Sequence, residues 1–197
     1  MTEQETLTGD VSLREKGLGD VTANKVSIKQ GSANDVKATT VEITLGGARN
    51  VQAEQVTLRQ AGARSVAGDD VVIRQGGVLQ LEAETIEATQ AGIGFARCEE
   101  ATAVGSQVGG LLADQVNLDQ SMANLVIASG GVPSVDQSLV GALVTGKAHV
   151  QNGVIGLVIA GKVEGEFQTL FGPRAALAFG AAFGAFTALV LRLTRRK

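Results

Sequence analysis

The chain has few of the residues from which most globular cores and catalytic sites are made. Its 197 residues include no Trp, no Tyr, one Cys, one His, two Pro and six Phe, five of which lie after residue 166. A single cysteine excludes an intramolecular disulfide and fits a reducing compartment. The body must therefore fill its core with Val, Leu, Ile and Ala, and the 26 Gly favour a narrow repetitive rod over a compact globule.

Charge is also sparse and nearly balanced. Charged residues make up 19% of the chain and the formal net charge is −3, so no basic surface for nucleic acid is predicted. Residues 1–6 are acidic and lack the apolar stretch of a secretory signal. We therefore expect a cytoplasmic body.

Residues 11–130 divide into eight consecutive blocks of equal length without insertions. With the positions of each block numbered from 1 to 15, apolar side chains recur at positions 1, 3, 8, 11 and 13. Position 1, for example, is Val11, Val26, Val41, Val56, Val71, Ile86, Ala101 and Val116. Alternation at every second position, interrupted by turns, is typical of short strands. The repeat predicts an all-β, single-stranded β-solenoid whose triangular coils have three sides of about five residues.

Two columns of the repeat favour stacked coils over independent hairpins. Position 5 is Gln in five of the eight blocks, and stacked amides can form a hydrogen-bonded ladder along the rod. Position 13 is small in every block, as a crowded inner column requires. A corner is expected at positions 6 and 7, which are rich in Gly and Ala. Residues 1–10 are predicted to be an N-terminal cap or a flexible lead.

The strict period breaks at residues 132–134, and similar phrases then begin at Gln137 and Gln151. We expect two or three less regular coils in residues 131–169. The later strands at residues 125–128 and 153–160 are apolar at both alternations, which indicates burial on both sides. Either these coils are better covered, or their outer surface packs against sister subunits or a partner, and we favour the second interpretation. The candidate interface residues are Leu125, Ile127, Val154, Ile155, Leu157 and Ile159.

The C-terminal segment is predicted to hold the chain at a membrane. After a junction at residues 170–174, residues 175–191 are uncharged, and residues 192–197 are mostly basic. Seventeen uncharged residues are at the lower limit for a helix that spans a bilayer. A helix that crosses, one that only dips in and a buried core helix all remain open, because crossing would carry the basic tail against the positive-inside tendency.

Two groups of residues in this segment are candidates for a role at the membrane. The predicted helix-packing residues form a small-xxx-small face with neighbouring aromatic rings: Gly180, Gly184, Phe179 and Phe183. The predicted junction residues are Phe167, Phe171, Pro173 and Arg174. Proline suits the first turn of a helix, and the arginine can extend its charge toward the lipid surface.

The sequence offers no recognisable catalytic or metal-binding set. His149 has no second ligand at a suitable spacing, and Cys98 occupies the small column at position 13, where an inert structural thiol is expected. The acidic pairs Asp69–Asp70 and Glu99–Glu100 fall at block ends, where solvated corners are expected. We predict neither enzymatic activity nor a cofactor.

Short coils with Val-x-Leu or Val-x-Ile columns, glycine corners and no catalytic set resemble those of bactofilins, the bacterial polymer-forming cytoskeletal solenoids. The resemblance covers roughly residues 11–166, with the closest phrase at residues 156–166. It implies self-association by end-to-end stacking and a scaffold role at a membrane. The chain departs from the family in its shorter coil and in its C-terminal apolar helix.

Two functions follow as hypotheses. The first is a membrane-anchored, self-associating solenoid with a structural role, whose partners are other copies of the chain and membrane lipid. The alternative is an accessory membrane-anchoring subunit that docks a soluble complex, such as a redox enzyme, and shelters a lipophilic molecule such as a quinone. A sugar-binding module has little support, because Phe95 is the only aromatic side chain before residue 167.

Overall fold

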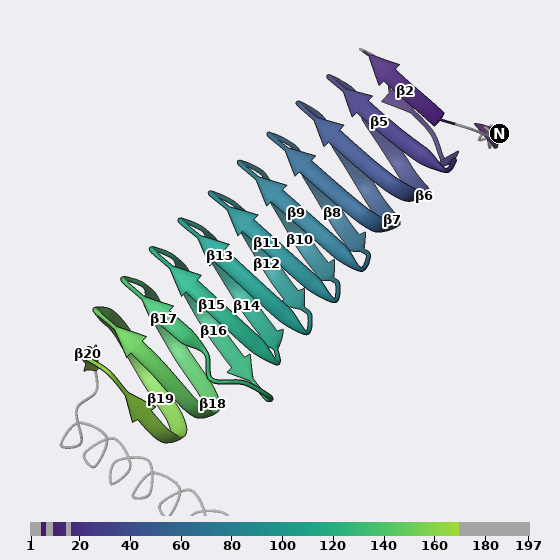
Figure 1. Cartoon of the computed structure of the whole chain (residues 1–197). Helices are drawn as coiled ribbons and strands as arrows, with labels where there is room; N and C mark the ends of the chain where they lie inside the picture. The colour runs from purple at the N-terminus through teal and green to yellow at the C-terminus, as the bar shows by residue number, and fades with distance from the viewer. Residues whose placement is uncertain (1–4, 7–9, 15–16, 170–197) are drawn as a thin grey trace, which may run out of the picture.

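The computed structural model describes residues 5–6, 10–14 and 17–169. These residues form an all-β, parallel β-solenoid of about ten coils stacked into a straight rod (Figure 1), which confirms the predicted fold class. The predicted helix at residues 175–191 lies outside the described residues. Within the described part of the chain, no helix is long and apolar enough to cross a membrane.

Each coil is built from short strands that follow one another around the rod. The first ten are β1 (Glu5–Thr6), β2 (Asp10–Arg14), β3 (Gly17–Leu18), β4 (Val21–Thr22), β5 (Lys25–Lys29), β6 (Ser32–Thr44), β7 (Gly47–Arg59), β8 (Gly62–Ala67), β9 (Asp70–Arg74) and β10 (Gly77–Glu82). The other ten are β11 (Thr85–Thr89), β12 (Gly92–Arg97), β13 (Glu100–Val104), β14 (Gln107–Ala113), β15 (Gln115–Asp119), β16 (Met122–Ala128), β17 (Ser134–Asp136), β18 (Leu139–Gln151), β19 (Gly153–Glu164) and β20 (Phe167–Thr169).

Strand pairing confirms the predicted period of the coil. All described pairings are parallel, and Val26 pairs with Val41 as Val56 pairs with Val71, which is one full repeat in each case. Between β15 and β17 the offset grows by two, so that Asn117 pairs with Ser134, and between β17 and β18 it returns to one repeat. We number the coils 1–10 by their residues at position 1: Val11, Val26, Val41, Val56, Val71, Ile86, Ala101, Val116, Pro133 and Ala148.

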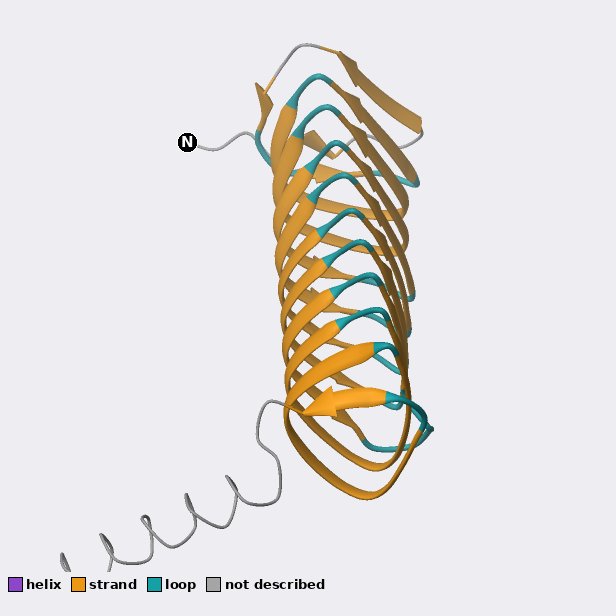
Figure 2. Ribbon diagram, turned by 90° about the vertical axis from the view of Figure 1, so that its left-hand side faces the viewer, coloured by secondary structure: helices purple, strands orange, loops and turns teal. Residues whose placement is uncertain are grey.

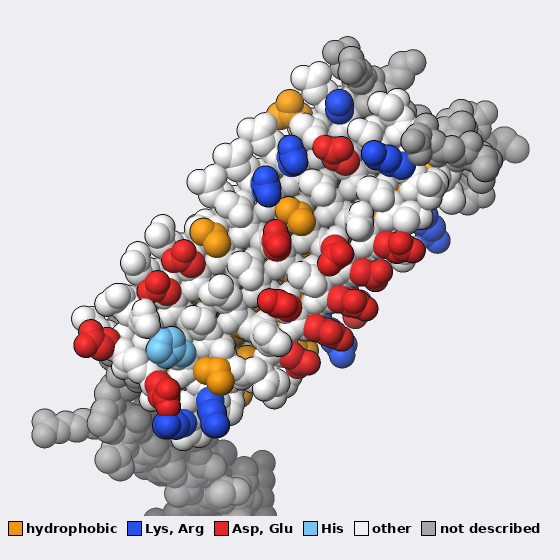
Figure 3. Space-filling model, in the orientation of Figure 1, with side chains coloured by type: hydrophobic (Ala, Val, Ile, Leu, Met, Phe, Trp, Pro, Cys, Tyr) orange, Lys and Arg blue, Asp and Glu red, His pale blue; other side chains and the backbone are white. Residues whose placement is uncertain are grey.

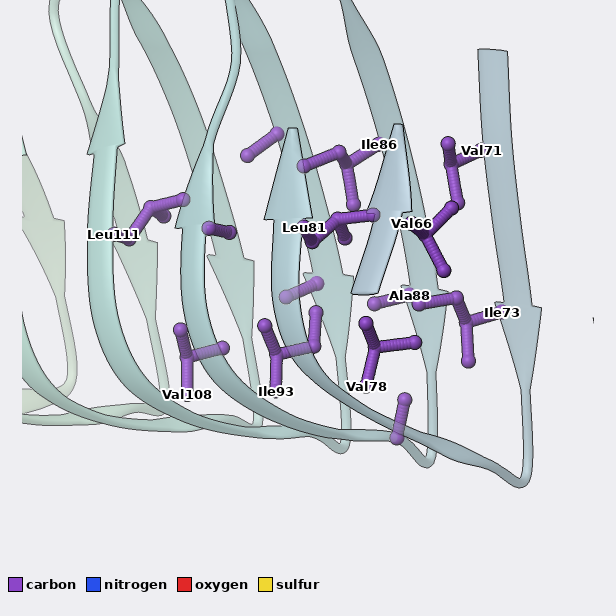
Figure 4. Close-up of a cluster of buried hydrophobic side chains, with 14 of the residues drawn as sticks. Val66, Val71, Ile73, Val78, Leu81, Ile86, Ala88, Ile93, Val108 and Leu111 are labelled. Carbon is purple, nitrogen blue, oxygen red and sulfur yellow. The ribbon is translucent and has the colours of Figure 1, made fainter. Parts of the chain in front are cut away.

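The interior is a set of columns that run along the rod, and Figure 4 shows part of them in the middle coils. Positions 1, 3, 8 and 11 supply its larger side chains, including Ile28, Leu58 and Leu143, each with no exposed surface. Side chains in one column stack at the strand spacing of about 4.8 Å. Position 13 is half-buried in most coils, and it packs against the core rather than within it.

The turn of each coil lies one residue earlier than predicted. Position 5 adopts φ between 44° and 58° in every coil from coil 2 to coil 10, mostly with Gln. Position 6 follows the turn and points inward. It is small because the interior is crowded there: a Cβ on Gly46 would lie 2.2 Å from the carbonyl oxygen of Gly31 in the coil before it. The predicted equivalence of Gln137 and Gln151 is also wrong by one residue, because Asn152 takes the left-handed conformation and Gln151 pairs with Asp136.

Two further bends complete the coil, as the rounded coils of Figure 2 show. Positions 9 and 10 are both exposed in coil 5, at Leu79 and Gln80, and the pairing of β10 with β12 omits Leu79. Positions 13 and 14 separate successive strands in coils 4, 5 and 6. The chain thus bends three times per coil. The first bend is at position 5, the second at positions 9 and 10, and the third at positions 13 and 14. Each bend changes the direction in which the outward side chains face.

Candidate interaction face

The outer surface between the second and third bends carries two columns of side chains, at positions 10 and 12. Position 11 between them points into the core, and Ala96, for example, has no exposed surface. In coils 6–10 the pairing aligns the position 10 column as Phe95, Gly110, Leu125, Ala142 and Leu157. It aligns the position 12 column as Arg97, Leu112, Ile127, Val144 and Ile159.

Nearly all of these outward side chains are apolar. We call Phe95, Leu112, Leu125, Ile127, Ala142, Val144, Leu157 and Ile159 the apolar face. Phe95, Leu125, Leu157 and Ile159 expose 49%, 38%, 50% and 58% of their surface. Isolated exposed apolar residues are ordinary, but a contiguous patch on consecutive strands is typical of an interface.

The same two columns are polar in coils 2–5 except at Ala67. Position 10 is Asp35, Asn50, Ser65 and Gln80, and position 12 is Lys37, Gln52, Ala67 and Glu82. The side-chain amide of Asn50 donates a hydrogen bond to the carboxylate of Asp35 in the coil before it. The backbone register is the same in both halves, so the apolar face is a property of the side chains and not of the fold.

An acidic column borders this surface at the third bend. Position 14 is acidic in five successive coils, and all five side chains are exposed: Glu54, Asp69, Glu84, Glu99 and Asp114. Acidic side chains gather along one edge of the rod in Figure 3. The predicted solvated pairs Asp69–Asp70 and Glu99–Glu100 belong to this edge. Among the described residues, no group of three or more His, Cys, Asp or Glu is arranged to hold a metal ion.

Cys98 and His149 lie outside the apolar face. Burial, and then the nearby negative charge of Asp114, raise the pKa of the Cys98 thiol to about 12. A thiol with this pKa stays protonated at neutral pH and is a poor nucleophile. His149 is an outward residue of coil 10, with its Nε2 2.9 Å from Nε2 of exposed Gln151.

Hydrogen-bonded ladders follow two other columns. Gln60 donates to Gln75 at 3.2 Å and Gln75 donates to Gln90 at 3.1 Å, which confirms the predicted glutamine ladder over these three coils. Buried serines at position 6 form a second ladder, in which the hydroxyl of Ser121 accepts from the backbone N–H of Ser106 at 3.1 Å. Ser138 accepts in the same way from the N–H of Ser121 at 3.0 Å. We did not predict the serine ladder, although Ser at the same position of successive coils was a visible signal.

Four of the predicted interface residues lie on the apolar face: Leu125, Ile127, Leu157 and Ile159. Val154 lies at position 7, half-buried beside Leu139 of the preceding coil. The prediction for Ile155 is wrong, because this residue occupies position 8 and is fully buried in the core. The prediction also missed Phe95, Leu112, Ala142 and Val144, which share positions 10 and 12 with the residues that it found.

The predicted membrane residues lie almost entirely outside the described part. Phe167 begins β20, and its side chain is outside the described set. Phe171, Pro173, Arg174, Phe179, Gly180, Phe183 and Gly184 fall in residues 170–197, outside the described residues.

The fold and its surface define a parallel β-solenoid whose outer columns at positions 10 and 12 differ along the rod. We call coils 2–5 the polar half and coils 6–10 the apolar half. Comparison with protein-family models, with curated proteins and with solved structures finds no match to this chain.

Proposed function

We propose that the chain is a structural protein: a self-associating β-solenoid, held at a membrane by its C-terminal segment, that acts as a scaffold without catalysis. The apolar face is the observation that carries this proposal. It lies on strands whose other side already faces the core of the rod, so the exposed parts of its side chains are not needed to fill that core.

A second copy is the simplest occupant of this face. Every copy presents the same surface, and two flat sheet faces pack about 10 Å apart with interdigitated side chains. Removing apolar surface from water contributes about 25 cal/mol per Å2, so the exposed parts of Phe95, Leu125, Leu157 and Ile159 favour association. A face shared between identical chains needs no further protein.

The membrane and scaffold parts of the proposal rest on the sequence. Residues 175–191 contain no charge, and basic residues follow them, which suits a segment that binds lipid. The resemblance of the coils to those of bactofilins supports a structural role of the same class.

Coexpression of two differently tagged full-length copies tests the proposal. Capture of one tag from a mild-detergent extract should recover the other copy, and mass photometry should give an assembly of two or more chains. Mixing the two copies after extraction controls for association on the resin. A strictly monomeric protein at micromolar concentration contradicts self-association.

The same experiment separates the alternative. If the tagged chain is recovered as one copy together with one defined soluble protein, in a fixed ratio, the scaffold proposal is replaced by the alternative. The chain is then an accessory subunit that docks this partner through the apolar face.

A further inference from the structure

In coils 2, 3, 5 and 6, positions 10 and 12 of the same coil carry side chains that complement each other. Coil 2 has Asp35 and Lys37, coil 3 has Asn50 and Gln52, and coil 5 has Gln80 and Glu82. Coil 6 has Phe95 and Arg97, which are both exposed. The two members of each pair flank the buried position 11, so within one chain they stand side by side and face outward.

We infer that two copies pack in parallel around a two-fold axis that runs along the rod over position 11. This arrangement rests on the self-association proposed above, and it specifies which residues meet. A two-fold axis along the rod exchanges the two columns without changing height. Position 10 of each coil therefore meets position 12 of the same coil in the partner.

The parallel arrangement gives the outward residues of coils 2, 3 and 5 a suitable neighbour, whereas Ser65 of coil 4 meets the partner's Ala67. Asp35 meets the partner's Lys37, and Lys37 meets the partner's Asp35, so the two coils form two ion pairs. Gln52 meets the partner's Asn50, and two side-chain amides can hydrogen-bond as donor and acceptor. The charges and amides of coils 2 and 3 then contribute to the interface instead of opposing it.

Phe95 marks the boundary between the polar and apolar halves. Its ring lies against Gly110 of the next coil, where an added Cβ would come within 2.9 Å of Phe95 Cδ2. Gly110 is buried under the ring, while 49% of the Phe95 surface is exposed. The two-fold axis brings the partner's Arg97 to the same height as this ring, where a guanidinium can stack on the open side.

The apolar half is complementary in size. In coil 7, the partner's Leu112 meets the Phe95 ring that covers Gly110, and in coil 9, Ala142 meets the partner's Val144. Small residues opposite larger ones allow the two sheets to approach closely and interdigitate. Coil 10 pairs Leu157 with the partner's Ile159, and these two are the most exposed members of the apolar face.

Buried area favours the parallel over the antiparallel arrangement. Coils 2–10 at a spacing of about 4.8 Å give a contact roughly 43 Å long, and a width of about 15 Å covers roughly 650 Å2 per copy. A standard interface buries about 800 Å2 per partner. An antiparallel pair centred on coil 8 overlaps only in coils 6–10, covers roughly 360 Å2 per copy, and separates the charged pairs of coil 2.

Spin-label distances in the full-length protein test the arrangement. Thr39→Cys and Gly146→Cys place a label at position 14 of coils 2 and 9, in a Cys98→Ala background. Both sites are exposed, and a Cβ at Gly146 meets no atom within 4 Å. The parallel pair predicts the same distance between copies at both sites.

The alternatives give different readings. An antiparallel pair centred on coil 8 places the Thr39 labels about 58 Å apart along the rod and the Gly146 labels about 10 Å apart, and this result overturns the parallel arrangement. A dimer with any other unequal pair of distances overturns it as well. A monomeric mass with no distance between copies overturns the proposed function and this inference together.

Charge reversal provides a second readout. Asp35→Lys or Lys37→Asp alone should weaken association roughly two- to tenfold, because each places like charges opposite each other twice per dimer. The double variant should restore it, because the two-fold axis again pairs opposite charges. The exposed Glu87→Lys, at position 2 on another side of the coil, is the control. Single variants that associate like the wild type overturn the inference.

Discussion

Coils 2–5 and coils 6–10 share one backbone path and differ in what they present to the outside. In both halves position 11 faces the core, buried in coils 2–9 and half-buried at Val158 of coil 10, and the strands pair at the same register. At positions 10 and 12 six of the eight side chains in the first half are charged or amide, whereas eight of the ten in the second half are apolar. In a solenoid, the inward columns specify the fold while the outward columns are free to specify contacts, so one rod can carry two surfaces.

Two different ladders also fasten the coils, one that begins in the first half and ends in coil 6, and one that lies in the second half. Exposed Gln60, Gln75 and Gln90 link coils 4–6 at the first bend, while buried Ser106, Ser121 and Ser138 link coils 7–9 one position further on. The ladders make the comparison testable, because a change in one half should leave the other half's ladder intact.

The largest effect is expected from the core, and it should be the same in both halves. Leu58→Ala in coil 4 and Leu143→Ala in coil 9 each remove a side chain with no exposed surface. Each should lower the free energy of unfolding by about 2–5 kcal/mol, because a cavity remains. Urea denaturation followed by circular dichroism measures the loss. Leu79→Ala, at a side chain that is 62% exposed, is the control. A large loss in only one half would show that the two cores differ.

The next effect should be confined to the second half. Ser121→Ala removes an acceptor for the Ser106 N–H and leaves that buried donor without its bond. The free energy of unfolding should fall by about 1–3 kcal/mol, the cost of an unsatisfied buried polar group. Ser32→Ala, at an exposed site in coil 2, should change it little. Equal losses for both variants would remove the serine ladder from the account.

A smaller effect should distinguish conformation from hydrogen bonding at the first bend. Gln75 has φ of 54° and takes part in two side-chain hydrogen bonds. Gln75→Ala loses these bonds and keeps the left-handed strain, whereas Gln75→Gly loses the bonds and relieves the strain. Thermal unfolding should place the glycine variant about 1 kcal/mol above the alanine variant. Gly105 at the same position of coil 7 shows that the coil accepts glycine there. The reverse order would show that the conformational entropy that glycine loses on folding outweighs the relief of left-handed strain.

The smallest effect concerns Cys98, in coil 6 at the boundary of the halves. Its folded pKa of about 12 lies above the ordinary value of 9.0, so the unfolded chain loses the thiol proton first as pH rises. The stability of the wild type relative to Cys98→Ala should therefore be constant below about pH 9 and fall between about pH 9 and pH 12. Denaturant melts at several pH values measure this difference. A difference that rises with pH has the wrong sign for a buried neutral thiol.

The repeat allowed the fold to be predicted because the inward columns repeat with little variation. The Val and Ile residues that dominate position 1 and the small residues at position 13 were enough to specify parallel stacking with this period. The place of the first bend was missed, because Gln gives no hint of a left-handed conformation and position 6 is small for a packing reason. Ile155 was misplaced because the strand is apolar on both sides, so alternation no longer indicates which residues face inward.

The interaction face was predicted in part for the same reason. The phrases around Leu125 and Leu157 were visible as apolar on both alternations. Ala142 and Val144 are less conspicuous, and Phe95 stands alone in its strand. Only the register, which places Phe95, Leu125 and Leu157 in one column, shows that they belong to a single surface.

Sedimentation equilibrium of two matched variants tests most directly whether the apolar face drives self-association. Leu157 and Leu45 are each 50% exposed, but Leu157 lies on the apolar face and Leu45 lies at the first bend of coil 3. In full-length protein in mild detergent, Leu157→Glu should weaken association by at least about tenfold, because a charge enters an apolar contact, while Leu45→Glu should associate like the wild type. Unchanged association of Leu157→Glu, or an equal loss in both variants, would contradict the account.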